Sequence, residues 1–216
     1  MKKRIAVLLS GNGSNLEALY RQGTAFDIAL VASNKNDVGG VNKAKSWGLN
    51  TIALGREDYP SVLAQKEAIY NAVDKSEPDL IVLAGYLQII EPNFVQRYKD
   101  RIINIHPSLL PNFAGLHGRA VHEAAIASEH AEHGCTVHLV DNGVDTGSKI
   151  SQMSLIIKPK ETADEIAARV LALEHTLYPW TVDNISLGKI ELKNGKVSYS
   201  SEIVERCKQK GIKIFQ

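Results

Sequence analysis

The first 106 residues alternate between short apolar runs and segments with helical spacing, and this alternation limits the possible folds more than any other feature. The main apolar runs cover residues 4–10, 27–33, 79–85 and 102–106, with a shorter one near 50–54. They are apolar almost throughout, which is typical of parallel strands covered on both faces. The intervening segments predict helices at 14–22, 40–47, 60–75 and 92–98. Together they predict a parallel sheet with helices on both sides.

The second half of the sequence predicts further strands at 134–141 and 149–157 and a helix near 118–129. A long amphipathic helix is expected to begin at Thr162 and to end before Pro179. Residues 188–200 contain Asn194-Gly195, which predicts an antiparallel hairpin. We therefore expect a Rossmann-like α/β fold with a mostly parallel twisted sheet, flanking helices and a C-terminal antiparallel hairpin. No linker divides the chain, so residues 1–216 are expected to form a single domain with two halves, 1–100 and 101–216.

Composition and charge exclude several classes of protein. The net charge is +1, and no long basic run is present, so neither a nucleic-acid partner nor a membrane surface is expected. No apolar run approaches the roughly 20 residues that span a membrane. The apolar core of the first ten residues is followed by glycines, which favours a strand over a signal peptide. Cys135 and Cys207 have no metal-type spacing, and we expect reduced thiols in a cytoplasmic protein.

A polar pair interrupts the apolar run at 102–106. Asn104 and His106 are two residues apart, so both side chains face the same side of a strand. Pro107 ends that strand and places the pair near its carboxyl end, where open α/β sheets keep their ligand crevices. Two hydrogen-bonded core residues would give the same pattern. Burying an amide and an imidazole is costly without partners, which favours a functional pair.

The turn Gly11-Asn-Gly13-Ser-Asn follows the first strand and precedes a helix. Ser14 and Glu17 have capping-box spacing, so the helix is expected to begin at Ser14. Backbone N–H groups at such a helix end form an anion site. Leu16 stands where a dinucleotide-binding turn has its third glycine, so a phosphate monoester fits the turn better than a dinucleotide does.

Two carboxylates each have two interpretations. Asp145 lies in a glycine-bearing loop beyond the strand that carries His138, and is either a common turn residue or a partner of His106. As a partner it would raise the pKa of the imidazole and favour the protonated form. Glu174, on the long helix, is either solvated or partly buried. The chain lacks H-E-x-x-H, paired cysteines and a G-x-S-x-G elbow, so neither metal catalysis nor a serine hydrolase is expected.

The segments GNGSNLEAL, LAGYLQII, NIHPSLLPNFAGLHG, HGCTVHLVDNGVDTG and EHTLYP occur in this order along most of the chain. Together they closely resemble the phosphoribosylglycinamide formyltransferases, a folate-dependent family of purine biosynthesis. The resemblance implies transfer of a formyl group from 10-formyltetrahydrofolate, as co-substrate, to the amine of glycinamide ribonucleotide (5-phosphoribosylglycinamide) in the synthesis of IMP. It implies small-molecule substrates and no metal, with the N-terminal half binding phosphate and the second half carrying catalysis and folate. Either a monomer or a homodimer is compatible with it.

The family's catalytic set corresponds here to Asn104, His106 and Asp145. Asn104 and protonated His106 would donate hydrogen bonds to the oxyanion, and Asp145 would keep His106 charged and organise a proton-carrying water. The resemblance places the ribonucleotide at Gly13, Ser14, Asn15, Leu171, Ala172, Leu173 and Glu174. It places the folate at Lys66, Leu87, Gln88, Ile89, Ile90, Asn104, Asp141, Asn142, Gly143, Val144 and Asp145.

The sequence departs from the family in three places. Family members commonly carry Arg where this chain has Gln88, and the Arg or Lys of the preceding helix matches only Lys66. Both changes would weaken contacts to the glutamate tail of the folate. The loop reads DTGS where DTGP is usual. A formyltetrahydrofolate hydrolase, a formyltransferase acting on a sugar nucleotide and a non-catalytic binding protein of the same fold remain alternatives.

Overall fold

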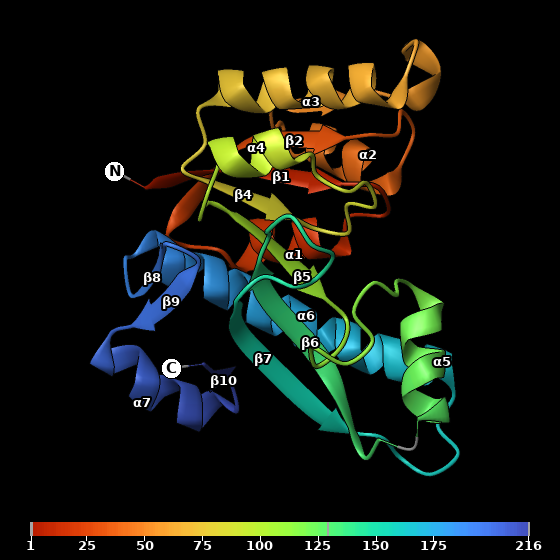
Figure 1. Ribbon diagram of the computed structural model, residues 1–216, viewed down its shortest axis with the longest axis vertical. Coiled ribbons are helices and arrows are strands. Elements are labelled where there is room, and N and C mark those ends of the chain that lie inside the picture. The colour runs from red at the N-terminus through yellow and green to blue at the C-terminus, as the bar shows by residue number, and fades with distance from the viewer. Residues whose placement is uncertain (1, 129, 216) are drawn as a thin grey trace.

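The computed structural model describes residues 2–128 and 130–215, and its centre is an eight-stranded sheet (Figure 1). The strands are β1 (Lys3–Leu9), β2 (Phe26–Ser33), β3 (Thr51–Ala53), β4 (Leu80–Leu83), β5 (Ile102–His106), β6 (Glu132–Leu139), β7 (Lys149–Ile156) and β10 (Lys213–Ile214), in the order β10-β7-β6-β5-β4-β1-β2-β3. From β3 to β5 all neighbours are parallel. The strands β6, β7 and β10 join by antiparallel pairing. The predicted mostly parallel sheet is confirmed.

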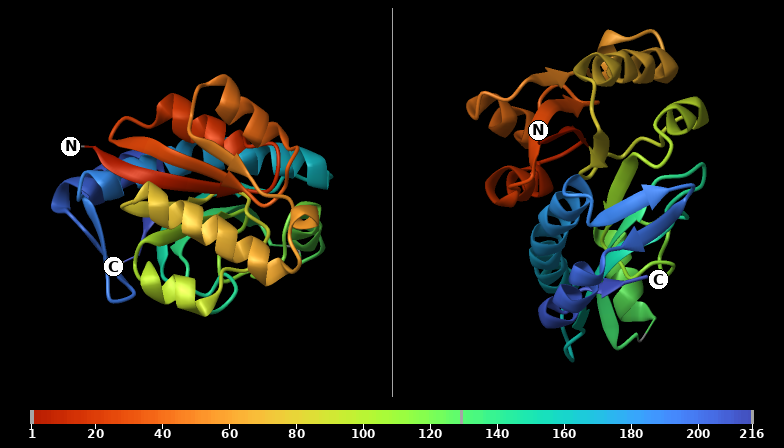
Figure 2. Two further views of the ribbon diagram at one scale, coloured as in Figure 1. Left: turned by 90° about the horizontal axis from the view of Figure 1, so that it is seen from above. Right: turned by 90° about the vertical axis from the view of Figure 1, so that its left-hand side faces the viewer.

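Helices cover both faces of this sheet (Figure 2). They are α1 (Ser14–Gln22), α2 (Gly39–Ser46), α3 (Val62–Ser76), α4 (Pro92–Arg97), α5 (Arg119–Ala127), α6 (Ala163–Ser186) and α7 (Ser201–Lys210), with a 3-10 turn η1 (Arg56–Asp58). The alternation of side chains along β1 shows why both faces need cover. Ile5, Val7 and Leu9 pack in a cluster with α1, α2 and α6, whereas Ala6 and Leu8 pack in a second cluster with α3 and α4.

The prediction that the long helix α6 ends before Pro179 is wrong. The helix continues through this proline to Ser186. Proline has no N–H to donate to the His175 carbonyl, which normally disfavours a helix interior. Here the residues around it are buried: Leu177, Tyr178 and Val182 are fully covered by the core. Burial of this apolar face outweighs the lost hydrogen bond.

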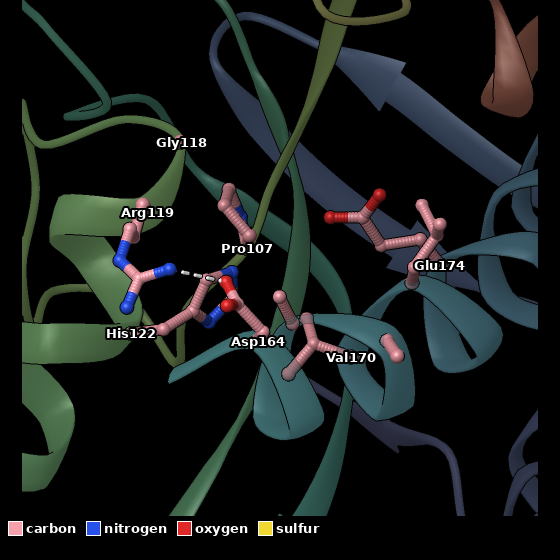
Figure 3. A pocket seen from close by; sticks show the side chains of 10 residues that line it. Pro107, Gly118, Arg119, His122, Asp164, Val170 and Glu174 are labelled. Carbon is pink, nitrogen blue, oxygen red and sulfur yellow. Dashed lines mark hydrogen bonds and ion pairs between the residues drawn. The ribbon is translucent and has the colours of Figure 1, made fainter. Parts of the chain in front are cut away.

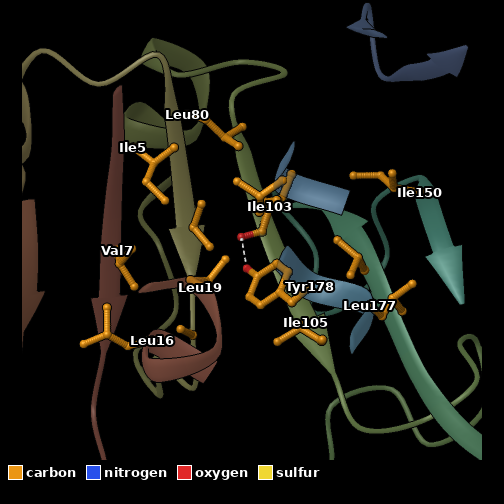
Figure 4. Close-up of a cluster of buried hydrophobic side chains, with 14 of the residues drawn as sticks. Ile5, Val7, Leu16, Leu19, Leu80, Ile103, Ile105, Ile150, Leu177 and Tyr178 are labelled. Atoms are coloured by element: carbon orange, nitrogen blue, oxygen red, sulfur yellow. Dashed lines mark hydrogen bonds between the residues drawn. The ribbon is translucent and has the colours of Figure 1, made fainter. Parts of the chain in front are cut away.

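Tyr178 lies in the middle of the first hydrophobic cluster (Figure 4). Its hydroxyl group is 2.8 Å from the Leu83 carbonyl oxygen and 3.3 Å from the Ile103 carbonyl oxygen. Leu83 is the last residue of β4 and Ile103 lies within β5, so one hydroxyl on α6 bridges two adjacent strands. This buried phenol has a partner, as buried tyrosines usually do.

Two helix starts differ locally from the predictions. Helix α1 begins at Ser14 as expected, but the capping box is wrong: Gly13 is the N-cap residue, with φ of 69°, and no side chain caps the helix. Ser14 is therefore already inside the first turn. Helix α3 begins at Val62 rather than at Pro60, because the Ser61 side chain accepts a hydrogen bond from the Ala64 N–H. Helix α6 begins at Ala163, one residue after the predicted start, and Thr162 is its N-cap residue in a capping box with Glu165.

The C-terminal region adds elements that the sequence did not predict. The expected hairpin is present as a separate two-stranded sheet, β8 (Ile190–Lys193) and β9 (Lys196–Tyr199). It is followed by α7 and by β10, which pairs with β7 at the sheet edge. Both cysteines are free and buried. Within residues 2–128 and 130–215, no helix is long and apolar enough to cross a membrane.

Candidate active site

A cavity of about 620 Å³ opens at the carboxyl ends of β4 and β5. Its walls are three connecting segments: residues 84–91 after β4, residues 107–118 after β5, and residues 140–148 between β6 and β7. Asn104 and His106 both line it, as expected for polar residues two apart on one strand. This is the crevice position at which open α/β sheets bind ligands.

Four side chains form a connected polar cluster in this cavity. The Nδ1 atom of His106 is 3.2 Å from Oδ2 of Asp145. The other carboxylate oxygen of Asp145 is 3.5 Å from Nε2 of His138. The same Nε2 atom is 3.2 Å from Nδ2 of Asn104. The structure thus brings together the three residues Asn104, His106 and Asp145 and adds His138 to them.

The sheet register and one strained loop residue build this cluster. In the antiparallel pair β5–β6, Asn104 stands directly opposite His138. Asp145 reaches the pair from the following loop with a positive φ of 55°, an uncommon conformation for a residue with a side chain. The Gly115 N–H holds its Oδ2 at 2.9 Å. Two loops that are 30 residues apart therefore fix the carboxylate beside His106.

His138 is the member of the polar cluster that the sequence did not predict. Its Nδ1 atom is 2.8 Å from the Leu139 carbonyl oxygen, so this ring nitrogen donates to the backbone and fixes the orientation of the imidazole. The Nε2 atom lies within reach of both Asn104 Nδ2 and Asp145 Oδ1, so His138 positions the amide next to the carboxylate. A signal was present, because strand alternation with Cys135, Val137 and Leu139 on one face places His138 on the other face.

The protonation states differ from the expectation. Burial lowers the pKa of His106 and outweighs the opposing effect of the Asp145 carboxylate. The prediction that Asp145 keeps His106 protonated is therefore wrong for the free protein. Burial would by itself raise the pKa of Asp145, but the contacts with the two imidazoles and the Gly115 N–H lower it to about 2. The cluster at neutral pH pairs a neutral imidazole with an ionised carboxylate, and His106 Nε2 has no hydrogen-bond partner among the described residues.

The glycine turn meets the cavity through Asn15. The Nδ2 atom of Asn15 donates to Oε2 of Glu174 at 2.8 Å, whereas its Oδ1 atom is buried and unpartnered within the described part of the chain. Glu174 is buried as well, and burial raises its pKa to about 7 although the Asn15 hydrogen bond opposes this. The interpretation of Glu174 as a solvated helix charge is wrong. Gly13 does not touch the cavity; a Cβ atom there would lie 2.6 Å from the Gly40 Cα atom.

A second cavity of about 380 Å³ adjoins the first along α6. The two share Pro107, Gly118 and Glu174 as lining residues. Figure 3 shows the Glu174 side chain at one end of the second cavity and an ion pair between Arg119 and Asp164 at the other, with a distance of 2.6 Å. Glu174 thus stands between the two cavities.

Two of the histidines outside the polar cluster pair with each other. His122 and His133 are buried and hydrogen-bond to each other, with 3.0 Å between Nδ1 and Nε2. Burial lowers the pKa of both imidazoles. Among residues 2–128 and 130–215 there is no group of three or more His, Cys, Asp or Glu side chains that could hold a metal ion.

Residues 3–182 match the model of a family described as formyl transferase. The chain belongs to this formyl transferase family. Phosphoribosylglycinamide formyltransferase of Haemophilus influenzae is 38% identical over 196 residues, which cover 89% of this chain and 91% of that protein. The phosphoribosylglycinamide formyltransferase structure from Coxiella burnetii is 37% identical, with a TM-score of 0.85 over 92% of this chain and 94% of that one.

Some relatives within the formyl transferase family are much longer. The trifunctional purine biosynthetic protein adenosine-3 of Drosophila melanogaster is 39% identical over 184 residues. These residues are 82% of this chain but only 13% of that protein. The chain therefore matches one segment of the trifunctional relatives and most of the length of the bacterial ones.

The cavities include most, but not all, of the residues predicted to bind ligands in this formyl transferase. The first cavity is lined by Asn15, Leu87, Gln88, Ile89, Ile90, Asn104, His106, Asp141, Gly143, Val144, Asp145 and Glu174, and the second by Leu171. The residues that line neither are Gly13, Ser14, Lys66, Asn142, Ala172 and Leu173. Of these, Leu173 packs against the core. Lys66 is buried in an ion pair with Glu91, 2.5 Å away.

Proposed function

We propose that this chain transfers the formyl group of 10-formyltetrahydrofolate to the amine of 5-phosphoribosylglycinamide, a step of IMP synthesis. The observation that carries the proposal is the cluster of Asn104, His106, His138 and Asp145 at the base of the larger cavity. Family membership and the names of the full-length relatives support the same reaction. The folate is a co-substrate, and no step requires a metal.

Transfer begins when the amine nitrogen bonds to the formyl carbon and the carbonyl electron pair moves to oxygen. Asn104 has two amide N–H bonds; one points to His138, which leaves the other to donate to the developing oxyanion. This arrangement stabilises the tetrahedral intermediate without any change in the position of the side chain. His138 acts through Asn104 as a positioning residue.

The proton balance is carried by His106 with Asp145. His106 is neutral before reaction and has an unpartnered Nε2 atom, so it can accept the proton that the attacking amine loses. The ionised Asp145, next to Nδ1, stabilises the imidazolium that results. When the carbonyl re-forms, the bond to folate N10 breaks and the His106 imidazolium gives its proton to that nitrogen. His106 thereby returns to its neutral state.

The ribonucleotide occupies the side of the cavity formed by the glycine turn and α6. The helix N-terminus at Gly13, Ser14 and Asn15 binds its phosphate, because free N–H groups and the helix dipole face an anion there. Glu174 lies beside Asn15 and contacts the uncharged part of the ribonucleotide. The folate occupies the other side, between residues 87–90 and 141–145.

One assay tests this function. Purified protein is mixed with 10-formyltetrahydrofolate, with and without 5-phosphoribosylglycinamide, and both the formylated product and the released tetrahydrofolate are measured. We expect folate release only in the presence of the ribonucleotide, in a one-to-one ratio with product. Folate release without the ribonucleotide would instead assign a hydrolase. Binding of the folate without any turnover would assign a non-catalytic protein of this fold.

A further inference from the structure

We infer that this chain recognises the ring system of its folate co-substrate and gains little affinity from the negative charge of the glutamate tail. The inference rests on the proposed function. A folate consists of a pteridine, a benzoyl ring and one or more glutamates, and each added glutamate brings one more carboxylate. A site that exploits those carboxylates needs cationic side chains at the open end of the folate cavity.

None of the described residues that line the larger cavity is Lys or Arg. Its acidic residues are Asp141, Asp145 and Glu174. A polyanionic tail at the open end of this cavity therefore meets no attraction from a lysine or arginine in the wall.

The mouth of the cavity is apolar instead. Leu87 and Ile89 are 59% and 67% exposed, and Leu116 and Val144 are exposed beside them on the other two walls. Large apolar side chains left in solvent on three converging segments mark a surface that a ligand covers. A benzoyl ring between them would be bound by burial of apolar surface, which does not depend on charge.

The amide of Gln88 is held in place by two side-chain hydrogen bonds. Its Oε1 atom accepts a hydrogen bond from the Tyr86 hydroxyl at 3.1 Å, and its Nε2 atom donates to Gln65 Oε1 at 2.9 Å. Gln65 is itself fully buried, and its Nε2 atom donates to the Asn34 and Leu54 carbonyl oxygens. Both ends of the Gln88 amide are therefore occupied by a network anchored in the core.

Lys66 is the nearby cation on α3, and its charge is neutralised internally. Its side chain is only 10% exposed, and Nζ lies 2.5 Å from Oε1 of Glu91. The Glu91 backbone N–H is fixed in turn by the Tyr70 hydroxyl at 3.0 Å. Because the Lys66 charge is already balanced by a carboxylate, a tail carboxylate that reached it would gain less than it would from a free lysine.

Steady-state kinetics with two forms of the co-substrate test the inference. The value of kcat/KM is measured for the monoglutamate and the triglutamate of 10-formyltetrahydrofolate at low salt. One exposed ion pair contributes about 0.2–1 kcal/mol, so a tail that used cations would gain up to about fivefold from each contact. For this chain we expect the two values of kcat/KM to agree within about threefold, since such contacts are missing. A larger preference for the triglutamate that falls as salt is added would overturn the inference.

Two variants supply the missing charge. Gln88→Arg is expected to create a preference of about fivefold for the triglutamate, which about 0.5 M salt abolishes. Gln88→Met, of similar length and without charge, is the control and should show no preference. Glu91→Gln frees the Lys66 charge and should also create a preference for the triglutamate. Its control is Glu67→Gln, which makes the same change of net charge on the exposed side of α3 and should create no preference. Equal ratios for Gln88→Arg and Gln88→Met would refute the role assigned to Gln88.

The failure of this inference can be distinguished from failure of the proposed function. Ribonucleotide-dependent turnover of the monoglutamate tests the reaction itself. The ratio of the two co-substrates tests only how the tail is recognised.

Discussion

Replacing Glu174 with Gln should stabilise the protein increasingly as the pH rises. Glu174 is 7% exposed, and burial raises its pKa from the ordinary 4.5 to about 7. Between these two values the folded chain keeps a proton that the unfolded chain has released. The unfolded state therefore binds fewer protons, and the free energy of unfolding decreases as the pH rises through this window. Gln carries no charge at any pH, and its amide oxygen can still accept the Asn15 hydrogen bond.

The size of the effect follows from the two pKa values. When the proton linkage is integrated from about pH 5 to about pH 8.5, Glu174 lowers the free energy of unfolding of the wild type by about 2.5 kcal/mol. The variant has no group that titrates at this position, so it does not lose this stability. Near pH 5 the wild-type side chain is mostly protonated and resembles Gln, so the two proteins should have similar stability. At the higher pH the variant should be the more stable by about that amount.

Urea unfolding at both pH values, followed by tryptophan fluorescence, measures this difference. Glu67→Gln is the control, since it makes the same chemical change on the exposed side of α3. The quantity compared is the free energy of unfolding of Glu174→Gln minus that of the wild type, which should increase with pH. An increase of less than about 1 kcal/mol between the two pH values, or a decrease, would refute the burial argument.

Three further predictions concern the cluster and the glycine turn. His106→Ala should lower kcat by about 10²–10⁴-fold, and a near-normal kcat in a steady-state assay would contradict its role. Ser14→Asp should raise KM for the ribonucleotide about tenfold through repulsion of its phosphate, and an unchanged KM would remove the turn from the site. Gly13→Ala should lower the free energy of unfolding by about 2–4 kcal/mol, because it combines a positive φ with a Cβ contact of 2.6 Å to Gly40. Gly48→Ala, with a similar φ and open space around it, should lose only about 1–2 kcal/mol; equal losses in urea unfolding would refute the steric argument.

Most of the fold could be predicted because its strands and helices carry strong local patterns. The apolar runs predicted all but the last of the strands in the central sheet, and the Asn194-Gly195 turn predicted the hairpin. The errors arose where long-range packing decides. The helix through Pro179 persists because its neighbours are buried, and β10 exists only because the edge of β7 is available to pair. Neither fact is visible in a local window of sequence.

In the candidate site, too, the features that depend on local geometry could be predicted and those that depend on distant contacts could not. The spacing of Asn104 and His106 predicted a shared cavity, since strand geometry is local. The contact with Asp145 could only be a hypothesis, because it depends on a loop 39 residues away that folds back with a positive φ. The charge on His106 was predicted wrongly, because the sequence shows the neighbouring carboxylate but not the burial that outweighs it.

The sequence by itself determined the α/β architecture, the polar pair at the end of a buried strand, the glycine turn and the family resemblance. These rest on periodicity, steric rules for glycine and proline, and short motifs, all of which act between residues close in the chain. Only the tertiary structure decided that His138 orients Asn104, that Glu174 is buried against Asn15, and that Lys66 is neutralised by Glu91. Proton affinity, tautomer and free charge depend on which distant groups share a dry environment, and that is settled when the chain packs.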